Sequence, residues 1–246
     1  MRFSLLGPLE VRDDQDHPVR IGEGRQRSVL VLLLLHRNER VASEWLVDAL
    51  WGEAPPATAA KILQNHVAQL RRGLGDREGR RLQTHGRAYA LRVEPGELDV
   101  EGFEQLVGEG AAALEHDRPA EAAARLREGL ALWRGPPLAD VAYEDFAQPE
   151  IAGLEEQRAV ALERRIDADL ALGRHADLLG ELEALVSRHP LREHLRGQRI
   201  LALYRCGRQA ESRRVQDAVP RTRRIGFDPA GPILPAARLQ SHHQGG

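Results

Sequence analysis

The residues best suited to recognise a ligand lie on one side of a predicted amphipathic helix, Thr58–Leu74. At 100° per residue, its large aliphatic side chains gather on one face and its amides and cations on the other. Candidate contacts on the polar face and its edges are Thr58, Lys61, Gln64, Asn65, Ala68, Arg71 and Arg72. Amides can read base edges, and cations can neutralise phosphates. This helix is therefore predicted to bind double-stranded DNA in the major groove.

Each candidate has an expected role. Gln64 and Asn65 lie at the centre of the polar face, and such amides pair bidentately with adenine, while Ala68 could meet a thymine methyl. Phosphate contacts are expected from Lys61, Arg71, Arg72 and Arg87. A simpler interpretation stays open for several of them, because surface amides aid solubility and exposed alanine favours a helix. His66 falls among the core residues and is expected to be structural.

The charge of the chain is unevenly distributed. Its formal net charge is −2, yet residues 61–92 contain eight basic and two acidic residues, a local net charge of +6. A basic segment in an otherwise acidic chain indicates one surface that binds a polyanion. A solvated loop explains Arg77–Arg81 equally well, but it does not explain the cations on the polar face of the helix.

Catalytic and metal-binding motifs are missing from the sequence. It contains no G-x-S-x-G, HExxH or Cys-x-x-Cys pattern, and Lys61, the only lysine, follows Ala60 and so cannot belong to a P-loop. We therefore expect no enzymatic activity, no metal site and no cofactor. His242-His243 could bind metal only adventitiously. The single cysteine, Cys206, excludes an intrachain disulfide.

The elements around the polar helix follow the order of a winged helix-turn-helix. An apolar helix is expected over Arg25–His36, and Ser43 is predicted to cap a second helix, Glu44–Trp51. After the polar helix, Arg81–Val93 alternates in polarity around Gly86, which is typical of a β-hairpin. This hairpin is the predicted wing.

The wing adds two candidate DNA contacts. His85 and Arg87 flank the turn and are predicted to lie near its tip, while Tyr89 and Leu91 are expected to face inward. The three tryptophans, Trp45, Trp51 and Trp133, are better explained as core residues than as stacking platforms.

Short strands precede these helices, and a different architecture follows them. Strands are expected over Arg2–Gly7, Leu9–Arg12 and Val19–Ile21, giving a small antiparallel sheet. Glu94–Asp99 contains proline and glycine and suits a joint between domains. Beyond about Val100, alanine, leucine, arginine and glutamate recur with helical spacing, and strand signals disappear.

An internal repeat organises the helical part. Gly173-Arg-His-Ala-Asp recurs as Gly207-Arg-Gln-Ala-Glu, and this offset of 34 residues equals the tetratricopeptide period. An earlier copy begins at Arg118, and Gly135–Pro149 is interpreted as an insertion in one repeat. The predicted fold is mainly α with a small β component. It joins an N-terminal winged helix-turn-helix, with its antiparallel sheet, to an all-α tetratricopeptide-like domain.

Length and hydropathy indicate how many domains the chain has and where in the cell it is located. Its 246 residues suit two domains, and an apolar content of 42% is enough for packed cores. The longest apolar run, Val29–Leu35, is too short to span a bilayer, and the first residues lack the features of a signal peptide. We expect a cytoplasmic, nucleoid-associated protein that does not bind membranes.

Several motifs together resemble the small Streptomyces antibiotic regulatory proteins, which join an OmpR-like winged helix to a tetratricopeptide-like bacterial transcriptional activation domain. The motifs are LLGPLEV (Leu5–Val11), ALWGEAPP (Ala49–Pro56), HVAQLRRGLG (His66–Gly75), LALWRGPPLADV (Leu130–Val141), ALGRHADLLGELEALVSRHPLRE (Ala171–Glu193) and ALYRCGRQAE (Ala202–Glu211). Gly226-Phe-Asp-Pro229 followed by Gly231-Pro232 is similar to the closing motif of the family. The resemblance covers most of the chain.

The resemblance implies a transcriptional activator of secondary-metabolite genes that binds promoter direct repeats and recruits RNA polymerase holoenzyme. It implies a DNA-binding domain over residues 1–94 and an activation domain over 99–240. Lys61–Arg72 would be the recognition helix, Arg81–Val93 the wing, and Gly52–Ala57 the loop facing polymerase. Two protomers on tandem half-sites, a homodimer on DNA, would bind cooperatively.

Two features depart from the family pattern, and two other functions stay open. The wing reads THGRAYAL where a Gly-Tyr pair is more usual, and Pro220 interrupts the last predicted helix. The repeats could instead form a protein-interaction scaffold beside a winged helix that no longer binds DNA. A regulator that responds to a small ligand is the third possibility, since repeat domains have concave surfaces.

Overall fold

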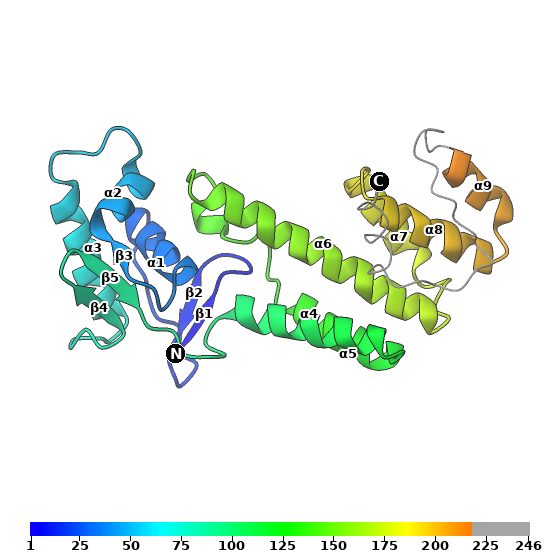
Figure 1. Cartoon of the computed structure of the whole chain (residues 1–246), viewed down its shortest axis with the longest axis horizontal. Helices are drawn as coiled ribbons and strands as arrows, with labels where there is room; N and C mark the ends of the chain where they lie inside the picture. Colours follow the sequence, from blue (N-terminus) through cyan, green and yellow to red (C-terminus); the bar gives the residue numbers. More distant parts are fainter. Residues whose placement is uncertain (218–246) are drawn as a thin grey trace, which may run out of the picture. The chain divides into compact units, whose positions relative to one another are not determined.

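The computed structural model describes residues 1–217, which separate into two compact units (Figure 1). The first unit comprises Met1–Gln105 and Ala131–Gln157. The second comprises Leu106–Leu130 and the described residues from Arg158 onward. The first unit combines short strands with helices, whereas the described part of the second is helical. The predicted fold class, mainly α with a small β component, is confirmed.

The first unit contains the winged helix. Its elements in chain order are β1 (Arg2–Ser4), β2 (Glu10–Arg12), α1 (Arg25–Leu35), β3 (Val41–Ala42), α2 (Ser43–Trp51), α3 (Ala59–Gly73), β4 (Leu82–His85) and β5 (Ala88–Leu91). β1 pairs antiparallel with β2, and a second antiparallel sheet has the strand order β3-β5-β4. The three helices therefore lie between a leading hairpin and the wing, in the predicted order.

The leading sheet is smaller than the sequence predicts. No strand forms over Val19–Ile21; Pro18 makes an isolated bridge to Arg12, and the N–H of Val19 donates to the carbonyl of Val11 at 2.8 Å. Proline has no N–H to contribute to a ladder, and beyond Pro18 the pairing extends no farther than Val19. The predicted third strand is wrong for this reason.

An additional strand, β3, leads from α1 into α2 and pairs with β5 of the wing. Ser43 consequently begins α2 instead of capping it. The hydroxyl of Ser43 donates to the carbonyl of Arg87 at 2.8 Å, and the backbone N–H of Ser43 donates to the same oxygen. The predicted capping role is therefore wrong, because this serine tethers the wing to α2.

The core of the winged helix forms around α1, in which Val29–Leu34 are all buried. A continuous apolar run of this kind can bury every face, because α2, α3 and β5 all pack against α1. Tyr89 and Leu91 of β5 are buried as well, so the inward-facing side of the wing is confirmed.

The segment that follows β1 is held by residues from beyond the winged helix. The carboxylate of Asp99 accepts the backbone N–H groups of Leu5 (2.8 Å) and Leu6 (3.0 Å). The carbonyl of Leu5 accepts the N–H of Leu138 at 3.0 Å. Gly135–Pro149, interpreted from the sequence as an insertion in a repeat, thus belongs to the first unit.

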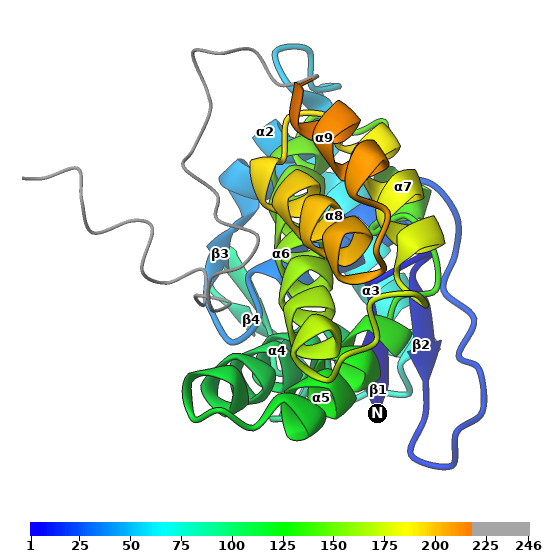
Figure 2. The same ribbon diagram turned by 90° about the vertical axis from the view of Figure 1, so that its right-hand side faces the viewer.

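Helices make up the regular structure of the described chain after the wing. The elements after the wing are α4 (Asp99–Glu115), α5 (Pro119–Ala131), the 3-10 helix η1 (Ala139–Val141), α6 (Ala147–Ala171), α7 (Leu179–Arg188), α8 (Glu193–Arg205) and α9 (Gln209–Asp217). α7 packs on α8 and α8 on α9 (Figure 2). Gly110 lets α4 approach α5 closely, since a Cβ at that position would lie 2.5 Å from Cγ of Leu126.

The internal repeat is visible in the way its helices end. Gly173 and Gly207 have positive φ angles of 78° and 74°. After each glycine comes an arginine whose N–H donates to a carbonyl five residues earlier, which is the Schellman form of helix cap. Asp117 (φ 54°) and Arg118 make the same cap. The three predicted copies therefore share one structural feature.

Among residues 1–217, no helix is both long enough and apolar enough to cross a membrane. Pro220, the motif beginning at Gly226 and His242-His243 lie outside the described residues. The predictions made for them stay predictions.

Glu97 joins the base of the wing to the N-terminal strand. Its Oε1 accepts from the ammonium of Met1 and from Nη2 of Arg81, both at 2.9 Å, and its Oε2 accepts the N–H of Glu94 at 2.9 Å. Its backbone carbonyl accepts the N–H of Phe3 at 2.7 Å. Burial alone would raise the pKa of Glu97, but the hydrogen bonds outweigh it and lower the pKa to about 2.

Replacing Glu97 with glutamine is expected to lower the free energy of unfolding by about 2–3 kcal/mol at pH 7, since one pKa unit corresponds to ~1.4 kcal/mol. The side chain is only 13% exposed, so solvent screens this effect weakly. Because the folded-state pKa lies below the unfolded value of 4.5, this stability is present above that pH and is lost as the pH falls toward 2.

Urea unfolding at pH 7 and near pH 3 checks the prediction for Glu97. The difference between wild type and Glu97→Gln should shrink to less than about half at the lower pH. Glu78→Gln is the control, because its ion pair with Arg80 is exposed and should contribute nothing measurable. A difference that stays constant with pH would show that the Glu97 charge is not the stabilising feature.

Candidate nucleic-acid interface

The polar face of α3 is open to solvent along its length. The residues predicted to contact DNA from this face are all exposed: Lys61, Gln64, Asn65, Ala68 and Arg72. The opposite face buries Leu63, Val67 and Leu70 in the core of the winged helix. Because the two faces are separate, α3 can present amides and cations to a partner without disturbing its own packing.

Two other residues of this region have distinct surroundings. Thr58 is exposed and immediately precedes α3, but its side chain forms no capping hydrogen bond. His66 is partly buried, as expected for a structural residue, and its Nδ1 has no hydrogen-bond partner within the described part of the chain.

Arg71 supports the wing. It is partly buried, its Nε donates to the carbonyl of Leu82 at 2.8 Å, and its Nη2 donates to Oγ1 of Thr84 at 2.7 Å. Both acceptors lie on β4, so this guanidinium fixes the wing relative to α3. The phosphate contact predicted for Arg71 stays a prediction, and the structure gives this residue an architectural role that the sequence did not indicate.

Substituting Arg71 with lysine is expected to lower the free energy of unfolding by about 1–2 kcal/mol, because one ammonium cannot reproduce both directed hydrogen bonds. Thermal unfolding measures the effect. Arg72→Lys is the matched control, since the side chain of Arg72 is exposed and keeps its charge in this change. Equal stability of the two variants would contradict the role assigned to Arg71.

Asp76 orders the loop between α3 and the wing. Its carboxylate accepts the backbone N–H groups of Arg80 (2.8 Å), Arg81 (3.1 Å) and Leu82 (2.7 Å). The sequence allowed this stretch to be a solvated charged loop. The stretch is a mostly exposed loop, Asp76 fixes its backbone, and it carries Arg77 as an exposed cation close in sequence to the end of α3.

The wing turns at Gly86 and Arg87. Gly86 has a φ of 62°, as the first residue of a two-residue type II′ turn requires. The side chain of Arg87 is 91% exposed and forms an ion pair with Glu44 at 3.3 Å. His85 is only partly exposed, and its Nε2 lies 3.0 Å from Oε1 of Gln83. At the tip, therefore, the side chain of Arg87 is almost fully exposed to solvent and that of His85 is partly exposed.

Acidic neighbours neutralise part of the basic segment 61–92. Arg81 is held by the partly buried Glu97. Exposed ion pairs with glutamates involve Arg80, Arg87 and Arg92. Such exposed pairs are weak, so these arginines can exchange a carboxylate for a phosphate. Within residues 1–217, the cations of the segment that have no hydrogen-bond or ion-pair partner are Lys61, Arg72 and Arg77. The available positive charge is thus centred on α3 and the loop after it.

Residues 98–233 match the family model described as bacterial transcriptional activator domain, and residues 19–91 match that described as transcriptional regulatory protein, C terminal. The chain is also 39% identical to the regulatory protein DnrI of Streptomyces peucetius, over 98% of this chain and 89% of DnrI. The chain belongs to the Streptomyces antibiotic regulatory protein family. As a member of this family it is a transcriptional regulator, with an OmpR-like winged helix followed by a bacterial transcriptional activator domain.

Other relatives contain additional sequence. The chain is 37% identical to the regulatory protein AfsR of Streptomyces coelicolor over 99% of this chain, but it spans only 24% of AfsR. The solved structure of Mycobacterium tuberculosis EmbR in complex with a low-affinity phosphopeptide matches it with a TM-score of 0.83 and 34% identity. That match covers 94% of this chain and 62% of EmbR. The fold of this family member thus agrees with that of an experimentally determined regulator.

Proposed function

We propose that this regulator binds promoter DNA sequence-specifically, with α3 in the major groove and the wing against the neighbouring backbone. The polar face of α3 carries the proposal, because the exposed amides Gln64 and Asn65 lie on the same face as the unpaired cations Lys61 and Arg72. Amides suit base edges, and cations suit the phosphates that border the groove. The match of residues 19–91 to a regulatory-protein domain supports this assignment.

The remaining contacts follow from the positions of their side chains. Arg87 and His85 approach the backbone from the tip of the wing, and Thr58 does so from the start of α3. Ala68 is small and exposed, which suits contact with a thymine methyl. Arg71 can contact a phosphate only through those guanidinium N–H groups that do not already donate to β4.

The finer parts of the proposal concern assembly at the promoter. Two protomers bind direct repeats as a homodimer on DNA and gain affinity from their linkage. Residues 1–94 form the DNA-binding domain and residues 99–240 the activation domain. The loop Gly52–Ala57 is exposed throughout and suits contact with RNA polymerase holoenzyme. The regulated genes belong to a secondary-metabolite cluster, and the protein acts in the cytoplasm at the nucleoid.

Gel retardation on promoter fragments from the genes next to its own tests this function. The expected result is retardation that survives excess non-specific DNA. Phosphate contacts by Lys61, Arg72 and Arg87 predict a slope of about −2.7 for log affinity against log salt concentration. If folded protein retards none of these fragments, the proposal fails and a protein-interaction scaffold becomes the better explanation.

A further inference from the structure

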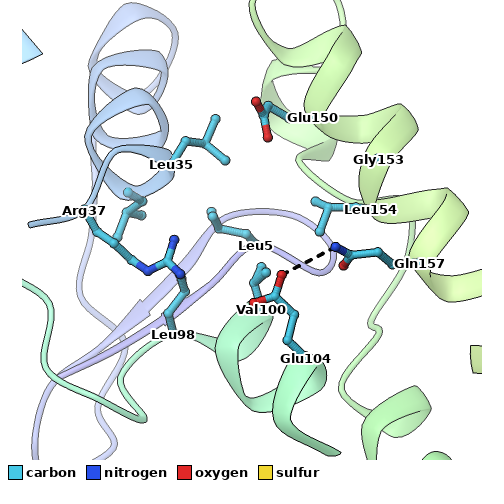
Figure 3. A pocket seen from close by; sticks show the side chains of 11 residues that line it. Leu5, Leu35, Arg37, Leu98, Val100, Glu104, Glu150, Gly153, Leu154 and Gln157 are labelled. Carbon is cyan, nitrogen blue, oxygen red and sulfur yellow. Dashed lines mark hydrogen bonds between the residues drawn. The ribbon is translucent and has the colours of Figure 1, made fainter. Parts of the chain in front are cut away.

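A pocket in the first unit is lined by residues that the proposed DNA contact does not use (Figure 3). Its volume is about 160 Å³. Its walls come from the segment after β1, the C-terminal end of α1, the start of α4 and the first turns of α6. A protein cavity of about 150 Å³ holds a benzene molecule. The pocket is therefore large enough for one six-membered ring.

The floor of the pocket is apolar. Leu35, which lines it, is partly exposed, and the other apolar residues there are buried: Leu5, Leu34, Leu98, Val100 and Leu154. Gly153 contributes no side chain, and an added Cβ there would meet nothing within 4 Å. An apolar floor of this size favours a ring or a short hydrocarbon.

The rim of the pocket is acidic. Arg37 is the only cation among the described residues that line it, and its charge is matched by an ion pair with Glu101. Glu104 lies 3.5 Å from the amide of Gln157, and Glu150 has no hydrogen-bond or ion-pair partner within residues 1–217. Figure 3 shows Leu5 and Leu154 between these two carboxylates. The rim therefore complements a positive charge.

We propose that this pocket binds a small amphipathic amine, with its ring against the leucines that line the pocket and its ammonium on Glu150, the rim carboxylate that has no partner within residues 1–217. An ammonium donates up to three hydrogen bonds, and the carboxylate of Glu150 can accept from it. A carboxylate on the same ring would meet like charge at the rim. The charge of the rim thus selects an amine over an acid of equal size.

Occupation of the pocket can affect the DNA-facing helix. Leu34 and Leu35 belong to α1, which packs directly against α3. A ligand that contacts these leucines would bias the position of α1. This regulatory consequence rests on the proposed function, whereas ligand binding itself does not.

The test uses the full chain, without DNA, and two probes of matched size, 2-phenylethylamine and phenylacetate. Methyl NMR spectra of ¹³C-leucine-labelled protein report binding directly from the floor of the pocket. The expected result is saturable shifts of the pocket leucines with the amine, and an affinity about two- to fivefold higher than for the acid. Glu150→Gln is expected to reduce this preference.

Gly153→Leu is the blocking variant, because the new side chain enters the empty space beside α6 and leucine favours a helix more than glycine does. It is expected to weaken amine binding at least about tenfold. Gly108→Leu, at another exposed helical glycine with open space around it, is the control and should bind as wild type does.

Three results would overturn the proposal: no saturable shift with the amine, equal affinity for amine and acid, or undiminished binding by Gly153→Leu. Because no DNA is present, none of these results bears on the contact proposed for α3. A failure to retard promoter DNA would likewise leave the pocket assignment intact.

Discussion

Replacing Lys61 and Arg72 together with alanine is expected to weaken promoter binding roughly 50-fold at 0.1 M salt. Both side chains are exposed on α3 and have no partner within residues 1–217, so their removal disturbs neither the core nor the wing. Each phosphate contact contributes about 0.9 to the slope of log affinity against log salt concentration, so the slope should become shallower by about 2. Fluorescence anisotropy at several salt concentrations measures the affinity and the slope.

Arg213→Ala with Arg214→Ala is the matched control for this double variant. It removes the same charge from two exposed arginines of α9, outside the winged helix. An equal loss of affinity would show that overall charge, and not the face of α3, governs binding. An unchanged salt slope in the Lys61 and Arg72 variant would contradict the phosphate contacts. Arg71 is unsuitable for this test because its removal also loosens the wing.

A second large effect is expected from replacing Asp169, in the second unit, with alanine. The carboxylate of Asp169 is only 2% exposed and accepts hydrogen bonds from three arginines, Arg127, Arg165 and Arg174. Arg165 is itself 8% exposed, so Asp169→Ala leaves a buried guanidinium without its inner partner. Breaking a buried pair costs about 3–5 kcal/mol. We expect the free energy of unfolding to fall by about 3 kcal/mol, since Arg165 keeps Glu181.

Urea denaturation followed by circular dichroism measures the loss caused by Asp169→Ala. Glu183→Ala is the control, because Glu183 is mostly exposed in its pair with Arg199 and its loss should be much smaller. If both variants lose the same stability, the buried network around Asp169 does not hold these helices together.

The sequence predicted the features that depend on local periodicity. The apolar residues of α3 recur with helical spacing, so its buried and exposed faces could be assigned before the structure was known. Alternation around Gly86 located the wing and the inward position of Tyr89. The repeat could be recognised from its recurring glycines. Gly173 and Gly207 end their helices in a backbone conformation that glycine adopts without strain.

The features that were missed depend on contacts between distant residues. A helical wheel places Arg71 at the edge of the polar face, but only the fold brings Leu82 and Thr84 within its reach. Trp45, predicted to be a core residue, is 43% exposed and forms a T-shaped ring pair with His36, with ring centroids 4.9 Å apart. Periodicity describes one element at a time and gives no information about such partners.

The docking of Gly135–Pro149 was also invisible in the sequence. Its attachment rests on backbone hydrogen bonds to the segment after β1 and on the ion pairs of Asp140 with Arg27 and of Glu144 with Arg25. Hydrogen bonds between backbone groups do not depend on residue type, so the sequence does not indicate them. An interruption of the repeat was recognised from the spacing, but its place in the first unit required coordinates.

The central claim, that the polar face of α3 enters the major groove, is tested most directly by cleaving promoter DNA from a reagent tethered to that face. Cys206 is the only cysteine, so Cys206→Ser with Gln69→Cys provides a single attachment point for an iron chelate on the exposed side of α3. The predicted result is strand cleavage confined to a few adjacent base pairs in each half-site. The same reagent attached through Gly108→Cys should produce no localised cleavage. Absent or uniform cleavage from position 69, with the promoter still bound, would contradict the claim.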